Sequence, residues 1–191
     1  MLDTPVNPSA EADVSRLGVP VEANLPDDVR SLIAANHREN WILALSANPE
    51  TARRFTAYFG RLFDPRHGRL PIRERELIAV VVSSTNGCGL CEIHHTLAFG
   101  EAVGDVVKAR RTALDRHLAP LTKREQALAD FAHKVTVEPK SIGLADFDRL
   151  RAVGLADADI LEALETSAWF NHTNRIFISL GVLPDEKYFA G

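Results

Sequence analysis

Apolar residues recur three and four positions apart in several segments of this chain, a spacing that places them on one face of an α-helix. One such segment begins at Asn48 and carries Phe55 and Phe59 on its apolar face. Another, over 122–137, opens with Thr-Lys-Arg-Glu, which matches a capping box. No segment outside 80–83 alternates or gathers β-branched residues as a strand does. The pattern therefore predicts an all-α chain of eight or nine helices.

Caps, prolines and glycines set the expected ends of these helices. Gly100 follows an apolar run and is expected to end a helix in the left-handed conformation. The segment after it is expected to be amphipathic around Val103, Val106, Val107 and Leu114. The predicted helices cover 25–37, 40–45, 48–63, 71–82, 92–99, 103–118, 122–137, 144–153 and 157–180.

The first 24 residues lack a helical period and contain Pro5, Pro8 and Pro20. This composition predicts an extended N-terminal arm over 1–24 and one helical domain over 25–191. A chain of 191 residues with 46% hydrophobic residues is large enough to bury one substantial core.

Charge is dispersed along the chain, with 22 Lys and Arg against 26 Asp and Glu and a net charge of −4. Without a basic patch, we expect neither a nucleic-acid partner nor an anionic membrane partner. The N-terminus lacks the basic start and apolar run of a signal peptide, and no apolar run approaches membrane-spanning length, so the expected location is cytoplasmic. We also expect no cofactor, because haem attachment needs a histidine directly after the second cysteine and Glu92 stands there.

The stretch 85–95 holds both cysteines of the chain, Cys88 and Cys91, just after an Asn-Gly turn. Cys91 follows Cys88 by three residues and precedes His95 by four, so all three side chains lie on one helix face. The start of a helix favours an anion, and such positions lower a thiol pKa from about 8.5 by one to several units. The sequence therefore predicts a reactive thiol pair.

A second prediction comes from the geometry of a helical hairpin that turns at residue 86. Facing positions then have numbers that sum to about twice 86, which places Glu76 opposite His95. At a rise of about 1.5 Å per residue, Glu76 lies ~15 Å from the turn and reaches the thiols only through the imidazole. The expected proton path runs from Glu76 through His95 to Cys91 and Cys88.

The order Glu76, eleven residues, Cys88-X-X-Cys91, three residues, His95 resembles the signature of the AhpD-like alkylhydroperoxidases, within the carboxymuconolactone decarboxylase superfamily. The segment 71–100 and the later Asn-Arg pair are similar to the branch called peroxidase-related enzymes. The resemblance implies an AhpD-like helical hairpin bundle, assembled as a homo-oligomer, often a trimer or hexamer. It also implies that Cys91 attacks the peroxide and that Cys88 resolves the product.

The function that the resemblance implies is a thiol-dependent hydroperoxide reductase, a peroxidase-type oxidoreductase. Its substrate is a hydroperoxide, and its partner is an external dithiol, such as a lipoyl or thioredoxin-type protein. The best-studied members carry a histidine directly before the second cysteine, where this chain has Leu90. The proton relay here therefore has one member fewer.

Other interpretations of the same residues stay open. Cys88, Cys91, His95 and Glu76 are all residue types that zinc accepts, so a metal-binding protein or a thiol sensor fits them too. Other members of the superfamily are non-redox decarboxylases or lactone-processing enzymes, a branch that works without a dithiol. Taken alone, His95 is most simply a core histidine, and Glu76 a first-turn residue that favours the helix dipole.

The last predicted helix contains a polar cluster over 171–175. Its position between two apolar stretches is similar to that of the Asn-Gly turn in the central hairpin. This faint internal echo makes Asn174 and Arg175 candidates for buried polar contacts between hairpins.

Overall fold

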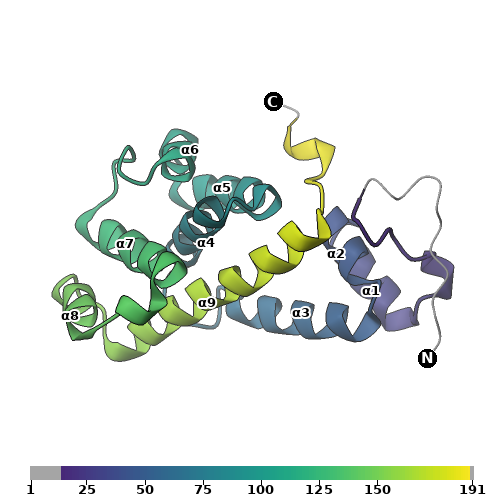
Figure 1. Cartoon of the computed structure of the whole chain (residues 1–191), viewed down its shortest axis with the longest axis horizontal. Coiled ribbons are helices and arrows are strands. Elements are labelled where there is room, and N and C mark those ends of the chain that lie inside the picture. The colour runs from purple at the N-terminus through teal and green to yellow at the C-terminus, as the bar shows by residue number, and fades with distance from the viewer. Residues whose placement is uncertain (1–13, 190–191) are drawn as a thin grey trace. The chain divides into compact units, whose positions relative to one another are not determined.

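The computed structural model describes residues 14–189, and this part of the chain is all-α, as the sequence predicts (Figure 1). It contains nine α-helices and three short 3-10 helices and no strand. None of the helices in the described range is both long and apolar enough to cross a membrane. The α-helices are α1 Asp27–Ala35, α2 Asn40–Leu45, α3 Pro49–Leu62, α4 Ile72–Asn86, α5 Gly89–Val103, α6 Val106–Leu114, α7 Lys123–Val137, α8 Leu144–Ala152 and α9 Asp157–Leu180.

The chain forms two compact units, of which the first contains the described residues 14–62 and 176–189. Helices α1, α2 and α3 pack against one another in this unit (Figure 1). Phe55 of α3 lies at the centre of its core, with the ring of Trp41 at 5.6 Å and that of Phe177 at 5.5 Å. The aromatic stripe predicted for α3 therefore belongs, at Phe55, to the core of this unit.

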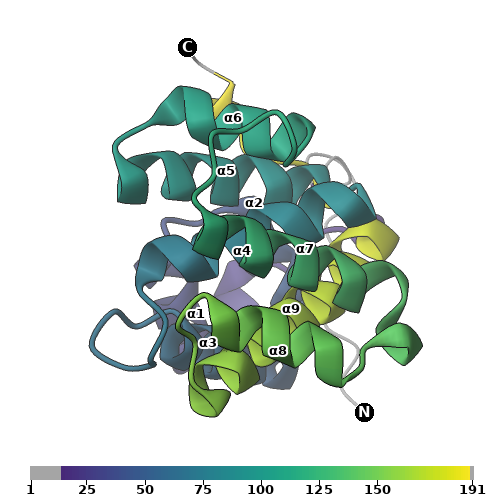
Figure 2. The same cartoon turned by 90° about the vertical axis from the view of Figure 1, so that its left-hand side faces the viewer.

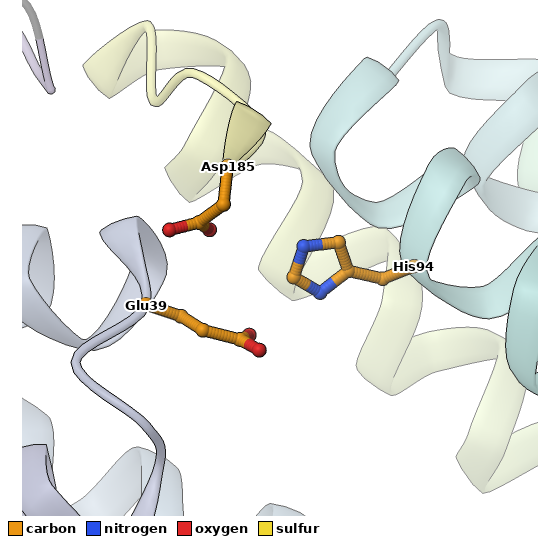
Figure 3. A group of neighbouring side chains, drawn as sticks. All are labelled: Glu39, His94 and Asp185. Atoms are coloured by element: carbon orange, nitrogen blue, oxygen red, sulfur yellow. The ribbon is translucent and has the colours of Figure 1, made fainter. Parts of the chain in front are cut away.

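Glu39 and Asp185, both in the first unit, form hydrogen bonds that link the segment after α9 to the start of α2. Glu39 accepts hydrogen bonds from Trp41 Nε1 at 2.9 Å and from the Tyr188 hydroxyl at 2.7 Å. Asp185 accepts the backbone N–H of Asn40 at 3.2 Å. Oxygens of the two carboxylates lie within 4.8 Å of each other (Figure 3). Burial and the nearby Glu39 carboxylate raise the pKa of Asp185.

Residues 14–24, the described part of the predicted arm, lie within the first unit. Val19 is buried there, and Arg16 donates to the backbone carbonyls of Ile178 at 3.0 Å and Ser179 at 2.8 Å. Residues 1–13 of the predicted arm lie outside the described residues. The division into an arm over 1–24 and one domain over 25–191 stays a prediction.

The second unit, Phe63–Arg175, is built around α4. Helix α4 packs against α5, α6 and α7, α6 also packs on α5, and α8 packs on α7 (Figure 2). Residues 74–83 of α4 are all buried, so this helix meets protein on every side. This burial fits the sequence, because residues 77–82 are apolar on every face of the helix.

Glu74 and Arg75, in the charged first turn of α4, are buried together with the apolar run. Arg124 of α7 donates to both carboxylate oxygens of Glu74, at 2.8 and 2.9 Å. The fully buried Arg75 donates to the backbone carbonyls of Leu70 and His67, each at 2.9 Å. A buried charge is tolerated only when it is paired or hydrogen-bonded, which is the case for each of these groups.

The predicted helix end at Gly100 is wrong, because α5 continues to Val103 and ends at Gly104, which has a φ of 67°. Gly100 lies inside the helix at a close approach of α6. A Cβ atom at position 100 would lie 3.3 Å from the Cα of Val106. The sequence has a glycine at both positions. Only the packing of α6 shows that Gly100 allows the close approach of two helices and that Gly104 is the helix cap.

Helix α6 is shorter than the predicted range of 103–118, and a different face of it is buried. It begins after Asp105, whose side chain accepts the N–H of Lys108 at 2.8 Å. Its buried residues are Ala109 and Thr112. The residues predicted as its apolar face are exposed instead: Val106 by 49%, Val107 by 59% and Leu114 by 82%.

Candidate functional site at the turn between α4 and α5

The turn between α4 and α5 places both cysteines at the start of α5. Helix α4 ends at Asn86, and Gly87 follows with a φ of 71°, a conformation that glycine adopts without strain. Cys88 is the N-cap of α5, and its N–H donates to the Ser83 carbonyl at 2.9 Å. Cys91 follows in the first turn. Both thiols are free and nearly buried, with exposures of 1% and 5%.

Hydrogen bonding distributes charge unequally over the two sulfurs. The Cys91 thiol donates to the sulfur of Cys88, and this hydrogen bond lowers the pKa of Cys88 to about 7. The backbone N–H of Cys91, the Asn174 amide and, when its ring is protonated, the charge of His95 act in the same direction, and burial opposes them. The same hydrogen bond, together with burial, raises the pKa of Cys91. Of the two sulfurs, Cys88 is therefore the one that carries negative charge more readily.

Glu76 and His95 meet across the hairpin, as its geometry predicts. Glu76 Oε2 lies 2.7 Å from His95 Nδ1, and the two side chains are 9% and 13% exposed. An ionised carboxylate only accepts, so Nδ1 carries the hydrogen in this pair. The carboxylate thus fixes the tautomer and leaves Nε2 of the neutral ring as the nitrogen that can take a proton.

Two aromatic rings hold the imidazole in place. Phe170 of α9 meets the His95 ring edge-to-face, with centroids 4.6 Å apart and an interplanar angle of 82°. Phe63 lies 5.8 Å from His95 and 5.7 Å from Phe170. Such pairs prefer tilted or edge-to-face arrangements. Glu76 therefore fixes the ring through one nitrogen, and the two aromatic rings restrict how it can turn.

Helix α9 contributes Asn174, which is completely buried beside the hairpin turn. Its Nδ2 donates to Ser83 Oγ at 3.2 Å, and its Oδ1 accepts from Asn86 Nδ2 at 2.9 Å. The Asn174 amide also hydrogen-bonds to both sulfurs, so it touches Cys88 as well as Cys91. The prediction that Asn174 makes buried polar contacts is confirmed. The second hairpin of that prediction is wrong, because α9 is one continuous helix and the contacts join it to α4.

Arg175, the other residue proposed for such contacts, is exposed and donates to Asn171 of its own helix at 2.6 Å, so that prediction is wrong. Sequence reasoning also missed Thr173, which hydrogen-bonds to Cys91, and Phe170, which packs on His95. These residues lie about 80 positions beyond the thiols. The only local signal for them is a polar cluster inside an otherwise apolar helix.

The sequence profile of the Carboxymuconolactone decarboxylase family matches residues 49–133, which include the whole α4–α5 hairpin. A comparison with curated proteins finds no match.

Solved structures with the same fold extend the likeness over nearly the whole chain. A peroxidase-related protein from Ralstonia eutropha JMP134, described as an alkylhydroperoxidase AhpD core, is 31% identical, with 92% of this chain and 95% of that chain covered and a TM-score of 0.87. A peroxidase-related protein from Silicibacter sp. TM1040 is 30% identical over 96% and 98% of the two chains, also with a TM-score of 0.87. The debrominase Bmp8, at 19% identity, covers 93% and 94% with a TM-score of 0.75, a likeness of fold alone.

Proposed function

Because the chain belongs to the AhpD-like group of the carboxymuconolactone decarboxylase superfamily, we propose that it is a thiol-dependent hydroperoxide reductase. The observation that carries this proposal is the pair of free, buried thiols three residues apart at the start of α5, with the Glu76–His95 pair in the same hairpin. A dithiol with one ionised sulfur has the two groups that peroxide reduction needs, a nucleophile and a resolving thiol.

In the proposed first step, the Cys91 thiolate attacks the distal oxygen of the hydroperoxide. The S–O bond forms as the O–O bond breaks, Cys91 becomes a sulfenic acid, and the alkoxide takes a proton from water to leave as an alcohol. The proton of the Cys91 thiol passes to the Cys88 thiolate, to which it already donates a hydrogen bond. Cys88 is thus the nearest base for Cys91.

In the second step, the Cys88 thiolate attacks the sulfenic sulfur and closes a Cys88–Cys91 disulfide. The hydroxide that is displaced leaves as water with the proton that His95 removed from Cys88. Cys88 must lose its proton again before this attack, and His95 Nε2 is the base that we assign to this proton, with Glu76 fixing its tautomer. An external dithiol then reduces the disulfide by exchange and becomes a disulfide itself. A lipoyl or thioredoxin-type protein supplies such a dithiol.

The decisive experiment follows cumene hydroperoxide reduction with a dithiol reductant. We expect turnover by the wild-type protein and a loss of about 10³-fold or more in Cys91→Ser, because no other residue supplies the attacking sulfur. Brief peroxide exposure without reductant is expected to remove two hydrogens from the mass and block both thiols. Full activity of Cys91→Ser would overturn the proposal.

The order of the two cysteines has its own test. The family resemblance assigns the attack to Cys91, whereas the lowered pKa favours Cys88. Trapping of sulfenic acid is expected to label Cys91 in Cys88→Ser and to leave Cys88 unlabelled in Cys91→Ser. The opposite pattern reverses the order and leaves the overall reaction unchanged.

Metal analysis separates this function from the metal-binding alternative. Protein purified without chelator is expected to carry no stoichiometric zinc and to keep its peroxide turnover in EDTA. Zinc at one ion per chain, with turnover absent, would favour metal binding by the cysteines. The homo-oligomer that the resemblance implies is checked by light scattering on the same sample, with a trimer or hexamer as the expected mass.

A further inference from the structure

Asn174 of α9 is the residue outside the predicted signature that the structure brings closest to the proposed chemistry. It is 0% exposed, although its side chain is fully polar. A buried amide that lacked partners would cost about 1–3 kcal/mol, so each of its contacts matters to its placement. Two of these contacts fix its orientation and two others reach sulfur.

The orientation of the Asn174 amide is set by its neighbours on α4. Asn86 Nδ2 donates to Asn174 Oδ1 at 2.9 Å, which assigns the oxygen to that side. Asn174 Nδ2 donates to Ser83 Oγ at 3.2 Å. The Asn174 amide therefore cannot flip without losing the hydrogen bond from Asn86, and its N–H groups stay on the side of Ser83 and the thiols.

The contacts with sulfur are shared between the two thiols. An amide nitrogen carries two hydrogens, of which one goes to Ser83 Oγ. The other is shared between Cys88 and Cys91, and this hydrogen bonding lowers the pKa of both thiols. Thr173, its neighbour on α9, reaches Cys91. A neutral donor stabilises a thiolate without pairing it permanently with a counter-charge.

We propose that the Asn174 side chain is a catalytic hydrogen-bond donor of the dithiol, which stabilises negative charge on whichever of the two sulfurs carries it. This inference rests on the proposed function. The reaction requires an anion first on Cys91 during the attack on peroxide and then on Cys88 during disulfide closure. A donor that contacts both sulfurs lowers the cost of both steps, and no counter-ion has to move with the charge.

The test measures thiol ionisation directly, without peroxide. Iodoacetamide alkylation of each cysteine is followed against pH by mass spectrometry in the wild type, in Asn174→Leu and in Asn171→Leu. The control, Asn171, lies one turn earlier on α9, where it accepts from Asn86 at 3.2 Å and donates to Thr136 at 3.0 Å. We expect the midpoint for Cys88 to rise by about one pH unit in Asn174→Leu, which slows alkylation at pH 7 by about fivefold. Asn171→Leu is expected to keep the wild-type midpoint.

Single-cysteine backgrounds test the claim that the donor is shared. Asn174→Leu is combined with Cys88→Ser and, separately, with Cys91→Ser. We expect the midpoint of the remaining thiol to rise in both backgrounds. A rise in only one of them, or an unchanged midpoint in a folded Asn174→Leu protein, overturns the proposal.

A second variant keeps the test decisive if Asn174→Leu does not fold. Asn86→Leu leaves Asn174 in place and removes the hydrogen bond that orients it, so alkylation of Cys88 at pH 7 is expected to slow about twofold. An unchanged rate in this variant counts against the proposal. Wild-type turnover of cumene hydroperoxide is measured in parallel. If the wild type shows no turnover but the alkylation midpoint shifts in Asn174→Leu, the proposed function is wrong and the role of Asn174 as a donor stands. If the wild type turns over peroxide but the midpoint does not shift, the proposed function stands and the role of Asn174 is wrong.

Discussion

Glu74 and Glu76 lie two residues apart in the first turns of α4, and both are buried, yet their partners differ in kind. Glu74 is paired with Arg124 through two hydrogen bonds of 2.8 and 2.9 Å. Glu76 is paired with His95 through one contact of 2.7 Å. The guanidinium keeps its charge at every relevant pH, and the hydrogen bond to Glu74 raises its pKa further. The imidazole has a second ring nitrogen, Nε2, that can accept or donate a proton.

The difference separates a structural carboxylate from a functional one within the same helix. The Glu74 pair has a fixed charge state, and it joins α4 to α7. The Glu76 pair can exchange a proton, and it ends at an imidazole whose charge acts on Cys88. Equal burial therefore does not imply an equal role, because the partner decides whether the carboxylate only stabilises the fold or also directs a proton.

The largest expected effect comes from breaking the structural pair. Arg124→Met leaves the Glu74 side chain, which is 4% exposed, without its counter-charge, and is expected to cost about 3–5 kcal/mol of unfolding free energy. Urea unfolding measures the loss. The control is Arg151→Met, which removes an arginine that is 45% exposed in its ion pairs and is expected to cost at most about 1 kcal/mol. Equal losses in the two variants would contradict the structural role of Glu74.

Breaking the second pair is expected to affect turnover more than stability. Glu76→Gln keeps the size of the side chain and removes the carboxylate that fixes the His95 tautomer, so peroxide turnover is expected to fall by about 10–100-fold. The matched control is Glu74→Gln in the same helix, whose turnover per folded molecule is expected to match the wild type. If both variants lose turnover equally, the distinction between the two carboxylates fails.

A pH series sharpens the contrast between the fixed pair and the titrating site. Since thiolate is the reactive form and the pKa of Cys88 is about 7, alkylation of Cys88 is expected to rise about tenfold per unit below pH 7 and to level off above it. Cys91→Ala removes the thiol donor, so the midpoint is expected to move upward, and less so in Cys91→Ser, which keeps a hydroxyl. The stability lost in Arg124→Met is expected to be the same at pH 6 and pH 8. A midpoint that stays at 7 in Cys91→Ala would show that the thiol donor is not what lowers it.

The smallest expected effect comes from loosening the aromatic rings around the imidazole. Phe170→Leu removes the edge-to-face contact with His95 and leaves the Glu76 hydrogen bond in place. Because such a contact contributes about 0.5–1.5 kcal/mol, peroxide turnover is expected to fall only about two- to tenfold. Phe147→Leu is the control, since that ring packs on Phe131 between α7 and α8. If turnover fell more in Phe170→Leu than in Glu76→Gln, the aromatic rings rather than the carboxylate would be what mainly orients His95.

The local pattern of the chain determined the helices, the hairpin and the pairing of Glu76 with His95. Helical spacing and caps are set by neighbouring residues, and the register of an antiparallel hairpin follows from the position of its turn. The same reasoning placed Cys88 and Cys91 at the start of α5, where the structure has them. Each of these features depends on residues within about one hairpin of one another.

Only the tertiary structure decided which residues of distant segments complete the site. Asn174 reaches the thiols, Phe170 reaches His95, and Arg124 reaches Glu74 because separate helices pack together, and no spacing along the chain encodes those contacts. For the same reason the sequence could not show that Gly100 allows α6 to pack closely on α5 and does not end the helix. Periodicity shows which face of a helix is apolar, but the neighbour that covers that face follows from the three-dimensional packing of the whole unit.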